Sequence, residues 1–211
     1  MPVAVTVDIV GSRRLPDRDA AQRALDAAIA RVEHDLPVAE RPLRPTVGDE
    51  LQGVFPALDA ALATTLLVQL ALTDIVECRF GLGIGETGLV ASASGDIPDG
   101  PAWWAARAAI DHVHALEQRT VPSARTWVVA HEEAGDAAHD AARRADAYLL
   151  VRDQVVGAMS ERARRLTYGR CFGVTQRKLA AREGITQSAV SQLLAASGAA
   201  SVVEGFRLLE T

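Results

Sequence analysis

Two aspartates lie where predicted strands meet turns. Asp8 comes near the end of the hydrophobic run Val3 to Ile9, and Asp49 follows Gly48 in a turn between two extended segments. Carboxylates at strand ends can hold a divalent cation, and Mg²⁺ is usually bound by only one or two protein carboxylates together with waters and substrate phosphates. The two residues therefore predict a metal site at a sheet edge. Two structural interpretations stay open, with Asp8 as a helix cap and Asp49 as an ordinary hairpin aspartate.

A second set of informative residues lies near the C-terminus. Thr175 is predicted to cap a helix that runs to Arg182, Gly184 permits a tight turn, and Thr186 is predicted to cap a second helix. The apolar residues of this segment have the spacing of one buried face shared by both helices, and they are Leu179, Ile185, Val190 and Leu193. The pattern is typical of a helix-turn-helix.

The polar residues of this helix pair suit a DNA reader. Glutamine can bond to adenine edges and serine tolerates several bases, while arginine and lysine contact phosphates. The residues predicted to contact double-stranded DNA are Thr175, Gln176, Arg177, Lys178, Arg182, Thr186, Gln187, Ser188, Ser191 and Gln192. The alternative is a helical hairpin that makes no DNA contact.

Charge is divided unevenly along the 211 residues. The net charge is −5, but residues 141 to 211 hold eleven Arg and Lys against six Asp and Glu, which gives +5 and leaves −10 for residues 1 to 140. A basic C-terminal part agrees with nucleic-acid binding. Cys78 and Cys171 lack metal-ligand spacing, so neither zinc nor a disulfide is expected. No signal or membrane segment is apparent, and we expect a cytoplasmic protein.

The hydrophobic pattern predicts mixed α+β structure. Strands or extended segments are expected at Val3 to Ile9, Leu43 to Val47, Leu51 to Phe55, Cys78 to Ile84 and Arg125 to Ala130. Helices are expected at Asp19 to Leu36, Ala57 to Leu72, Pro101 to Leu116 and Asp136 to Leu166, with a loop at Ser92 to Gly100. The order indicates a palm-like, ferredoxin-like βαββαβ core followed by an all-α domain. We expect a palm domain at 1–132, a connecting or dimerisation helix at 133–168 and a helix-turn-helix domain at 169–211.

Several motifs in one order carry a family resemblance. They are Asp8-Ile9-Val10-Gly11-Ser12, Gly48-Asp49-Glu50-Leu51-Gln52-Gly53, Arg79-Phe80-Gly81 leading to Gly85, and Asp99-Gly100-Pro101-Ala102 followed by Ala105-Ala106-Arg107. Their order resembles the class III nucleotidyl cyclase superfamily. With the predicted helix-turn-helix added, the chain resembles the SatD family of bacterial proteins over nearly its full length.

The resemblance implies roles for particular residues. Asp8 and Asp49 match the carboxylates that hold two Mg²⁺ ions in cyclases. Arg107 matches an arginine that stabilises phosphate charge during transfer. The residues expected to bind the phosphates of a purine nucleotide are Ile9, Val10, Gly11, Ser12, Gly48 and Arg107.

The chain also departs from the cyclase pattern at two positions. Pro45 stands where cyclases that recognise adenine keep a lysine, and Trp103 stands where an asparagine is usual. Nucleotide binding is therefore favoured over turnover. We expect a homodimeric DNA-binding transcriptional regulator of the SatD type, whose cyclase-like domain binds a purine nucleotide or its Mg²⁺ complex and/or dimerises. The alternative is an active nucleotidyl cyclase or related nucleotidyltransferase that uses Asp8, Asp49 and Arg107 as catalytic residues.

Overall fold

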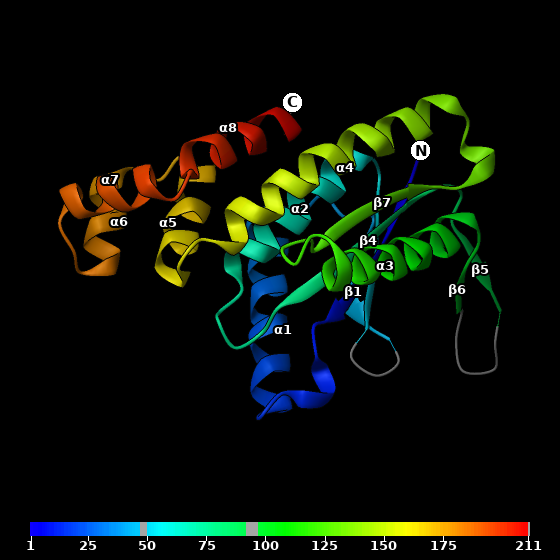
Figure 1. The fold of residues 1–211 in the computed structure, drawn as a ribbon, viewed down its shortest axis with the longest axis horizontal. Coiled ribbons are helices and arrows are strands. Elements are labelled where there is room, and N and C mark those ends of the chain that lie inside the picture. Colours follow the sequence, from blue (N-terminus) through cyan, green and yellow to red (C-terminus); the bar gives the residue numbers. More distant parts are fainter. Residues whose placement is uncertain (47–49, 92–96, 211) are drawn as a thin grey trace.

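The computed structural model describes residues 1–46, 50–91 and 97–210, and of Ile97 its backbone only. It contains a mixed α+β part and a helical C-terminal part (Figure 1). The strands are β1 (Val3–Ile9), β2 (Arg41–Pro45), β3 (Leu51–Phe55), β4 (Cys78–Ile84), β5 (Gly88–Val90), β6 (Ile97–Asp99) and β7 (Thr126–Ala130). The expected α+β fold class is confirmed.

The helices follow the strands in alternation and then continue alone. They are η1 (Ser12–Arg14), α1 (Arg18–Asp35), α2 (Leu58–Ala71), α3 (Pro101–Arg119), η2 (Glu132–Ala134), α4 (Asp136–Gly157), α5 (Glu161–Cys171), α6 (Gln176–Glu183), α7 (Gln187–Ala196) and α8 (Ala199–Leu209). Within the described residues, no single helix is long and apolar enough to cross a membrane, and only α7 and α8 taken together, bent by 78°, pass that test.

The main sheet has the strand order β2-β3-β1-β4-β7. Strand β1 pairs antiparallel with both β3 and β4, and β4 pairs parallel with β7. Because side chains alternate along a strand, β1 contributes to two cores. Val5 and Val7 join the large core with α1 and α2, whereas Ala4 packs with Trp103 and Ala106 of α3. This two-sided burial explains why the run is almost wholly apolar.

Two glycines of β4 let α3 approach the sheet closely. A Cβ atom on Gly83 would lie 1.9 Å from the carbonyl oxygen of Ala102, and one on Gly81 would lie 2.3 Å from that of Ala106. No larger residue fits at these positions without displacing the helix. The alternating glycines of this predicted strand therefore serve helix-to-strand contact.

Helix α4 covers the other face of β7, beside α2. Buried Asp146 accepts a hydrogen bond of 2.8 Å from the backbone N–H of Val128. Buried Asp153 accepts bonds from the backbone N–H groups of Arg125 and Thr126 at 2.8 and 2.7 Å. Helix α4 is thus hydrogen bonded to the sheet, while the expected boundaries at 132 and 168 stay a prediction.

Three local expectations need correction. The helical stretch from Asp136 to Leu166 is interrupted after Gly157, because Ser160 caps a new helix by accepting from the N–H of Ala163 at 3.3 Å. The segment expected as a loop, Ser92 to Gly100, contains the short strand β6, which pairs with β5. The extended segment expected at Leu43 to Val47 begins earlier as β2, and its last residue lies outside the described residues.

The C-terminal helices pack against the base of the sheet domain. Tyr168 of α5 donates a hydrogen bond of 2.8 Å to Asp35 of α1, and the guanidinium of Arg31 lies 3.8 Å from the Tyr168 ring centre. Phe172 contacts both Tyr168 and Phe206 of α8. Aromatic packing therefore joins the two parts of the chain into one continuous core.

Candidate functional site

Asp8 lies at the end of β1 and is held by a buried arginine. Its register partner on β4 is Arg79, whose Nη1 donates to Asp8 Oδ2 at 2.9 Å. Arg79 also donates through Nε and Nη2 to Glu117 of α3 at 2.7 and 2.6 Å. The Arg79 side chain is 8% exposed and that of Asp8 is 33% exposed. Asp8 is thus a positioned carboxylate rather than a helix cap, because Asp17 caps α1 by accepting from the N–H of Ala20.

The arginine–carboxylate pairs continue beyond Glu117. Arg125 reaches Glu117 through Nη1 at 3.2 Å and Glu77 through Nη2 at 3.1 Å. Asp8, Arg79, Glu117, Arg125 and Glu77 form what we term the arginine–carboxylate network. It connects β1 and β4 with α3 and the start of β7. Each arginine fixes carboxylates from separate elements, so the network holds the sheet edge rigid.

The loop after Asp8 borders a cavity. Gly11 adopts the left-handed conformation with φ of 63°, and the chain then forms the single turn η1 before α1 begins. The cavity has a volume of about 530 Å³ and is lined by Asp8, Ile9, Val10, Gly11, Ser12, Arg13, Arg14, Arg79, His114, Glu117, Gln118 and Pro122. Arg13 and Arg14 are exposed at this wall and can attract phosphate, whereas Arg79 is paired with Asp8 and Glu117. The structure brings Asp8 together with four of the predicted phosphate-binding residues, Ile9 to Ser12.

Arg107 lies apart from this cavity. Its guanidinium forms an ion pair with Glu50, and its side chain is 53% exposed. Because Val7 pairs with Leu51 in the antiparallel register, Glu50, which precedes β3, lies at the same end of the sheet as Asp8 near the end of β1. The predicted ligands Gly48 and Asp49 lie outside the described residues.

The expected Mg²⁺ site has few protein ligands among the described residues. These residues contain no group of three or more His, Cys, Asp or Glu side chains placed to hold a metal ion. Asp8 brings a carboxylate that is 33% exposed to the cavity wall, where Glu117 is 15% exposed and paired with Arg79. So few protein ligands fit a cation that is coordinated mainly by nucleotide phosphates and water, because Mg²⁺ is usually bound by only one or two protein carboxylates. They do not fit a dedicated protein cage.

Sequence reasoning missed the central role of Arg79. The signal was present, because Arg79 is the only charged residue in the run Cys78 to Ile84, and a charge inside a fully buried strand needs a partner. Its partners come from residues 71 positions before and 38 positions after it in the chain. Only the folded arrangement reveals them.

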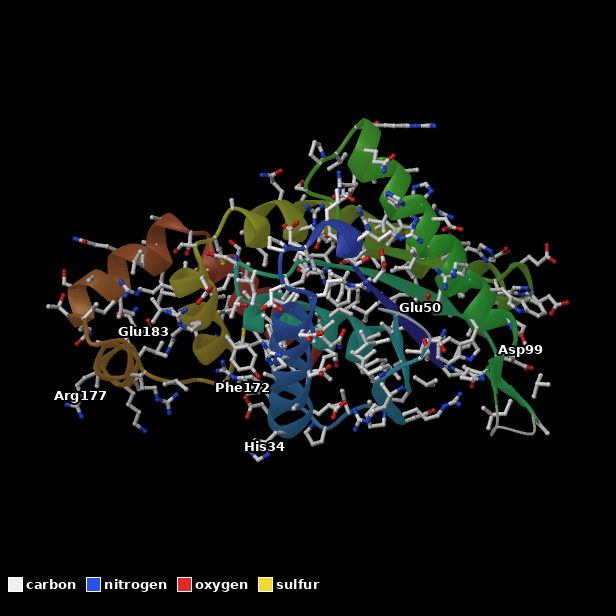
Figure 2. The ribbon with its side chains drawn as sticks, turned by 90° about the horizontal axis from the view of Figure 1, so that it is seen from below. His34, Glu50, Asp99, Phe172, Arg177 and Glu183 are labelled. Atoms are coloured by element: carbon white, nitrogen blue, oxygen red, sulfur yellow. The ribbon has the colours of Figure 1, made fainter. Side chains whose placement is uncertain are left out.

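A second candidate region is the helix pair, which we define as α6 and α7. The capping predictions are confirmed, because Thr175 accepts from the N–H of Lys178 at 3.3 Å and Thr186 accepts from that of Ala189 at 3.1 Å. Gly184 ends α6 in the left-handed conformation with φ of 64°. Of the predicted DNA contacts, Gln176 is half-buried and the rest are exposed. Figure 2 shows Arg177 of this pair far from Glu50, towards the opposite end of the molecule.

An acidic residue anchors the helix pair to α5. Glu183 accepts hydrogen bonds from Nε and Nη2 of Arg165, both at 2.9 Å, and from Nε of Arg162 at 3.3 Å. The Arg165 hydrogen bonds lower the pKa of Glu183 below its ordinary value, with a smaller contribution from Arg162. Sequence reasoning missed this contact too. It leaves the basic residues of the pair without a neutralising neighbour on α6.

Comparison with known proteins decides the family. The profile described as the SatD family matches residues 2–137. This chain belongs to the SatD family. The match spans the sheet domain and ends at the start of α4, so α5 to α8 lie beyond it. A search of curated protein sequences finds no relative of this SatD family member.

Several solved structures are similar to part of this chain. A bacterial light-regulated adenylyl cyclase has 15% sequence identity and a TM-score of 0.44, covering 60% of this chain and 74% of its own. The guanylyl cyclase Cya2 has 18% identity and a TM-score of 0.41, covering 53% and 70%. The guanylate cyclase domain of RhGC from Catenaria anguillulae, solved in complex with GTP, has 17% identity and a TM-score of 0.39, covering 50% and 70%.

Proposed function

We propose that this SatD family member is a DNA-binding transcriptional regulator whose sheet domain binds a purine nucleotide or its Mg²⁺ complex. The observation that carries the proposal is the exposed, unneutralised basic and polar surface of the helix pair. Arg177, Lys178 and Arg182 are exposed and take part in none of the ion pairs found among the described residues. Free cations on one surface attract a polyanion, because DNA binding gains from the release of counterions.

The second helix of the pair supplies the reading residues in this proposal. Gln187, Ser188, Ser191 and Gln192 are all exposed, while Val190 and Leu194 on the same helix are buried. One face of α7 thus packs against the rest of the protein, and the opposite face is polar and exposed. A helix that enters the major groove requires such a polar face. Most such modules bind as dimers to two half-sites, so we propose a homodimer.

The nucleotide proposal rests on the cavity beside Asp8. Arg13 and Arg14 are exposed at its wall and Arg79 is buried there, whereas Asp8 offers a carboxylate for a nucleotide-bound cation. For regulation, the nucleotide must bind one arrangement of the protein more tightly than another, since equal affinity shifts no population. Isothermal titration with ATP and GTP, with and without Mg²⁺, tests this. We expect binding that weakens in Asp8→Asn, and no binding at millimolar concentration would remove the nucleotide proposal.

Nucleotidyl transfer is the competing function. One observation weighs against it. Trp103, at the position where cyclases keep an asparagine, is buried among Ala4, Val54 and Ala106, where it faces the core instead of the cavity. Incubation with radiolabelled ATP or GTP and either Mg²⁺ or Mn²⁺ separates the two functions. A cyclic or polymeric product that Asp8→Asn abolishes would replace our proposal with the enzymatic one.

The DNA proposal is tested by a genome-wide pull-down. The double variant Gln187→Ala with Arg182→Ala should lose retention of specific promoter fragments, because it removes one groove contact and one phosphate contact. The matched control is Arg23→Ala, which removes an exposed arginine from α1, on the sheet domain. Unchanged retention in the double variant would contradict the assignment of α7 to the groove.

A further inference from the structure

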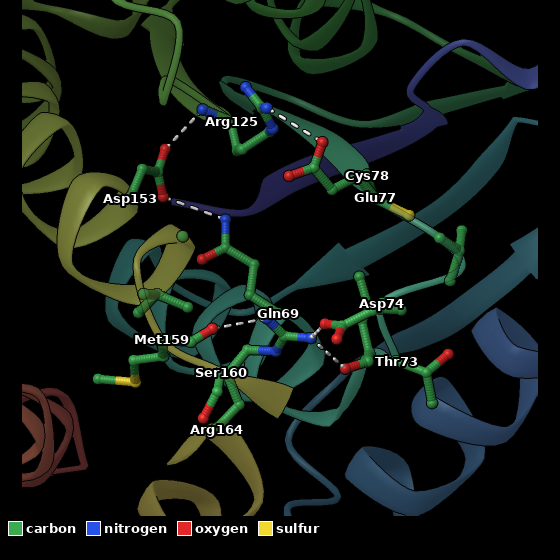
Figure 3. A pocket seen from close by; sticks show the side chains of 14 residues that line it. Gln69, Thr73, Asp74, Glu77, Cys78, Arg125, Asp153, Met159, Ser160 and Arg164 are labelled. Atoms are coloured by element: carbon green, nitrogen blue, oxygen red, sulfur yellow. Dashed lines mark hydrogen bonds and ion pairs between the residues drawn. The ribbon is translucent and has the colours of Figure 1, made fainter. Parts of the chain in front are cut away.

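A second cavity lies where the C-terminal helices leave the sheet domain (Figure 3). It has a volume of about 270 Å³. Its walls come from the end of α2 and the connection to β4, from the start of β7, and from the junction of α4 and α5. The apolar part of the lining includes Leu72, Val76, Val156 and Met159. None of its lining residues borders the cavity beside Asp8.

Unsatisfied polar atoms are concentrated among the residues that line this cavity. Among the described residues, eight buried side-chain nitrogen or oxygen atoms lack a hydrogen-bond partner, and four of them belong to residues that line it. They are Gln69 Oε1, Thr73 Oγ1, Arg125 Nε and Arg164 Nε. Buried polar groups in folded proteins are nearly always paired, so such a concentration indicates a place for a polar ligand.

The orientation of Gln69 is fixed by its neighbours. Its Nε2 donates to Asp153 Oδ1 at 3.0 Å and to Thr126 Oγ1 at 3.3 Å. An ionised carboxylate only accepts, so the amide nitrogen must face Asp153 and the carbonyl oxygen is left without a donor. Gln69 is only 8% exposed, and Figure 3 shows its oxygen turned away from Asp153. A residue of the cavity wall therefore carries one buried acceptor that requires an N–H or O–H group.

The two arginines supply the complementary donors. The terminal nitrogens of Arg125 donate to the carbonyl oxygens of Pro122 and Ala124 and form ion pairs with Glu117 and Glu77. Its Nε has no hydrogen-bond partner among the described residues. Arg164 uses its terminal nitrogens for the carbonyl oxygens of Met159 and Leu72 and for Asp74, and its Nε also has no such partner. Both Nε–H groups can only donate, so they require an acceptor such as a carboxylate.

We propose that this cavity binds a free amino acid or a molecule of the same size and polarity. The ligand's carboxylate accepts from the arginine Nε–H groups, its ammonium donates to Gln69 Oε1 and Thr73 Oγ1, and its apolar side chain lies against Leu72, Val76 and Met159. The exposed carboxylates Asp74 and Glu77 at the rim add attraction for the ammonium. The volume of about 270 Å³ lies below the range of about 300 to 1,000 Å³ that is typical of pockets for drug-sized molecules, which favours a ligand smaller than a nucleotide.

The position of the cavity gives such a ligand a structural effect. Arg164 belongs to α5, which carries the helix pair through Arg165 and Glu183, whereas Asp74 and Leu72 belong to the sheet domain. A ligand held between them stabilises one placement of the C-terminal helices. Arg125 is also a member of the arginine–carboxylate network, so the same ligand contacts the chain of ion pairs that ends at Asp8.

Thermal unfolding and isothermal titration of the full chain with each common L-amino acid test the proposal. We expect at least one to raise the melting temperature and to bind with a one-to-one stoichiometry. The matching primary amine and the matching carboxylic acid, which each lack one of the two charged groups, should bind at least about tenfold more weakly. If no amino acid binds at millimolar concentration, or if either analogue binds equally well, the proposal is overturned.

Variants place the ligand in this cavity and separate it from the nucleotide proposal. Thr73→Val keeps the shape of the side chain, removes one unsatisfied atom and should weaken amino-acid binding about tenfold while leaving nucleotide binding unchanged. Gln69→Met should abolish binding if the variant folds. The control Thr120→Val alters an exposed threonine at the end of α3 and should bind like the wild type. Wild-type affinity in Thr73→Val, or competition between the amino acid and ATP, would refute the assignment.

Discussion

The arginines of the sheet edge and those of the helix pair differ in what they face. Arg79, Arg107 and Arg125 are each joined to a carboxylate of another element. On α6, Arg177 and Arg182 are exposed and take part in no ion pair among the described residues. The paired cations have their charge satisfied inside the molecule and act by fixing geometry. The unpaired ones retain their attraction for an outside polyanion.

Removal of Arg79, one of the paired arginines, should have the largest effect on stability. Arg79→Met should lower the free energy of unfolding by about 3 kcal/mol, because it leaves the carboxylates of Asp8 and Glu117 without their shared partner. Urea denaturation followed by far-ultraviolet circular dichroism measures the change. Arg107→Met is the control. It removes a pair whose arginine is 53% exposed and should cost no more than about 1 kcal/mol. Equal losses in the two variants would contradict the central place of Arg79.

Asp146 offers a contrast inside the sheet domain, because it is a buried carboxyl group with no arginine partner. Burial raises its pKa to about 7, opposed by the hydrogen bond from Val128. Between the ordinary pKa of aspartate and this value, the folded state binds a proton that the unfolded state has lost, so stability falls as pH rises across that window. Asp146→Asn should remove this pH dependence of stability. At pH 8 the free energy of unfolding of the variant should exceed that of the wild type by about 2 kcal/mol. Parallel stability curves from pH 4 to pH 8 would contradict this.

The contribution of the unpaired arginines of the helix pair to DNA binding is tested through its dependence on salt concentration. Arg177→Ala should reduce DNA affinity about tenfold at low salt and decrease the slope of log affinity against log salt concentration by about 1. Fluorescence anisotropy with a labelled duplex, titrated at several salt concentrations, measures both. Arg23→Ala on α1 is the matched control and should leave the slope unchanged. If Arg177→Ala and the wild type had the same slope, DNA would have to bind to a surface other than that around Arg177.

Glu183 gives the smallest expected effect and shows how the helix pair is held. Its lowered pKa means that its contribution to stability is present above the ordinary pKa of glutamate and is lost as pH falls through the folded value. Glu183→Gln should therefore lower stability by about 1 kcal/mol near neutral pH, a value reduced by the solvent exposure of Arg162 and Arg165. Thermal unfolding at neutral and acidic pH measures the difference. A difference that persists at a pH where the Glu183 carboxyl group is protonated would exclude the ion pairs as its cause.

Local signals in the sequence predicted the helix pair well and the sheet edge only in part. Thr175, Gly184 and Thr186 act within three residues of themselves, so capping and turn preferences suffice to place them. The partners of Arg79 come from distant segments, and the pairing of Glu183 with Arg165 depends on how α6 lies against α5. Such contacts arise from packing, which no local preference encodes.

The contrast between local sequence preferences and packing contacts also explains which helices and strands differ from the sequence-based expectations. The interruption between α4 and α5 depends on a single capping serine within a sequence that favours helix throughout. Strand β6 has three residues and is defined by its pairing with β5, so it has too few side chains for a periodic pattern. Helix α8 was not assigned from the sequence, although its buried Val202, Val203 and Phe206 have helical spacing.

The close contact of α3 with β4 has a consequence for how the molecule responds to pressure. At Gly83 the nearest atoms of α3 all belong to the main chain, and at Gly81 they are main-chain atoms of Ala106 and Ile110 together with one side-chain atom, Cγ1 of Ile110. Close-packed contacts of this kind are scarcely compressible, and the volume that a protein can lose lies in its internal voids. Hydrostatic pressure should therefore shrink the 270 Å³ cavity at the root of the C-terminal helices first. The spacing between Arg79 and Glu117 across the α3 contact should be the last to change.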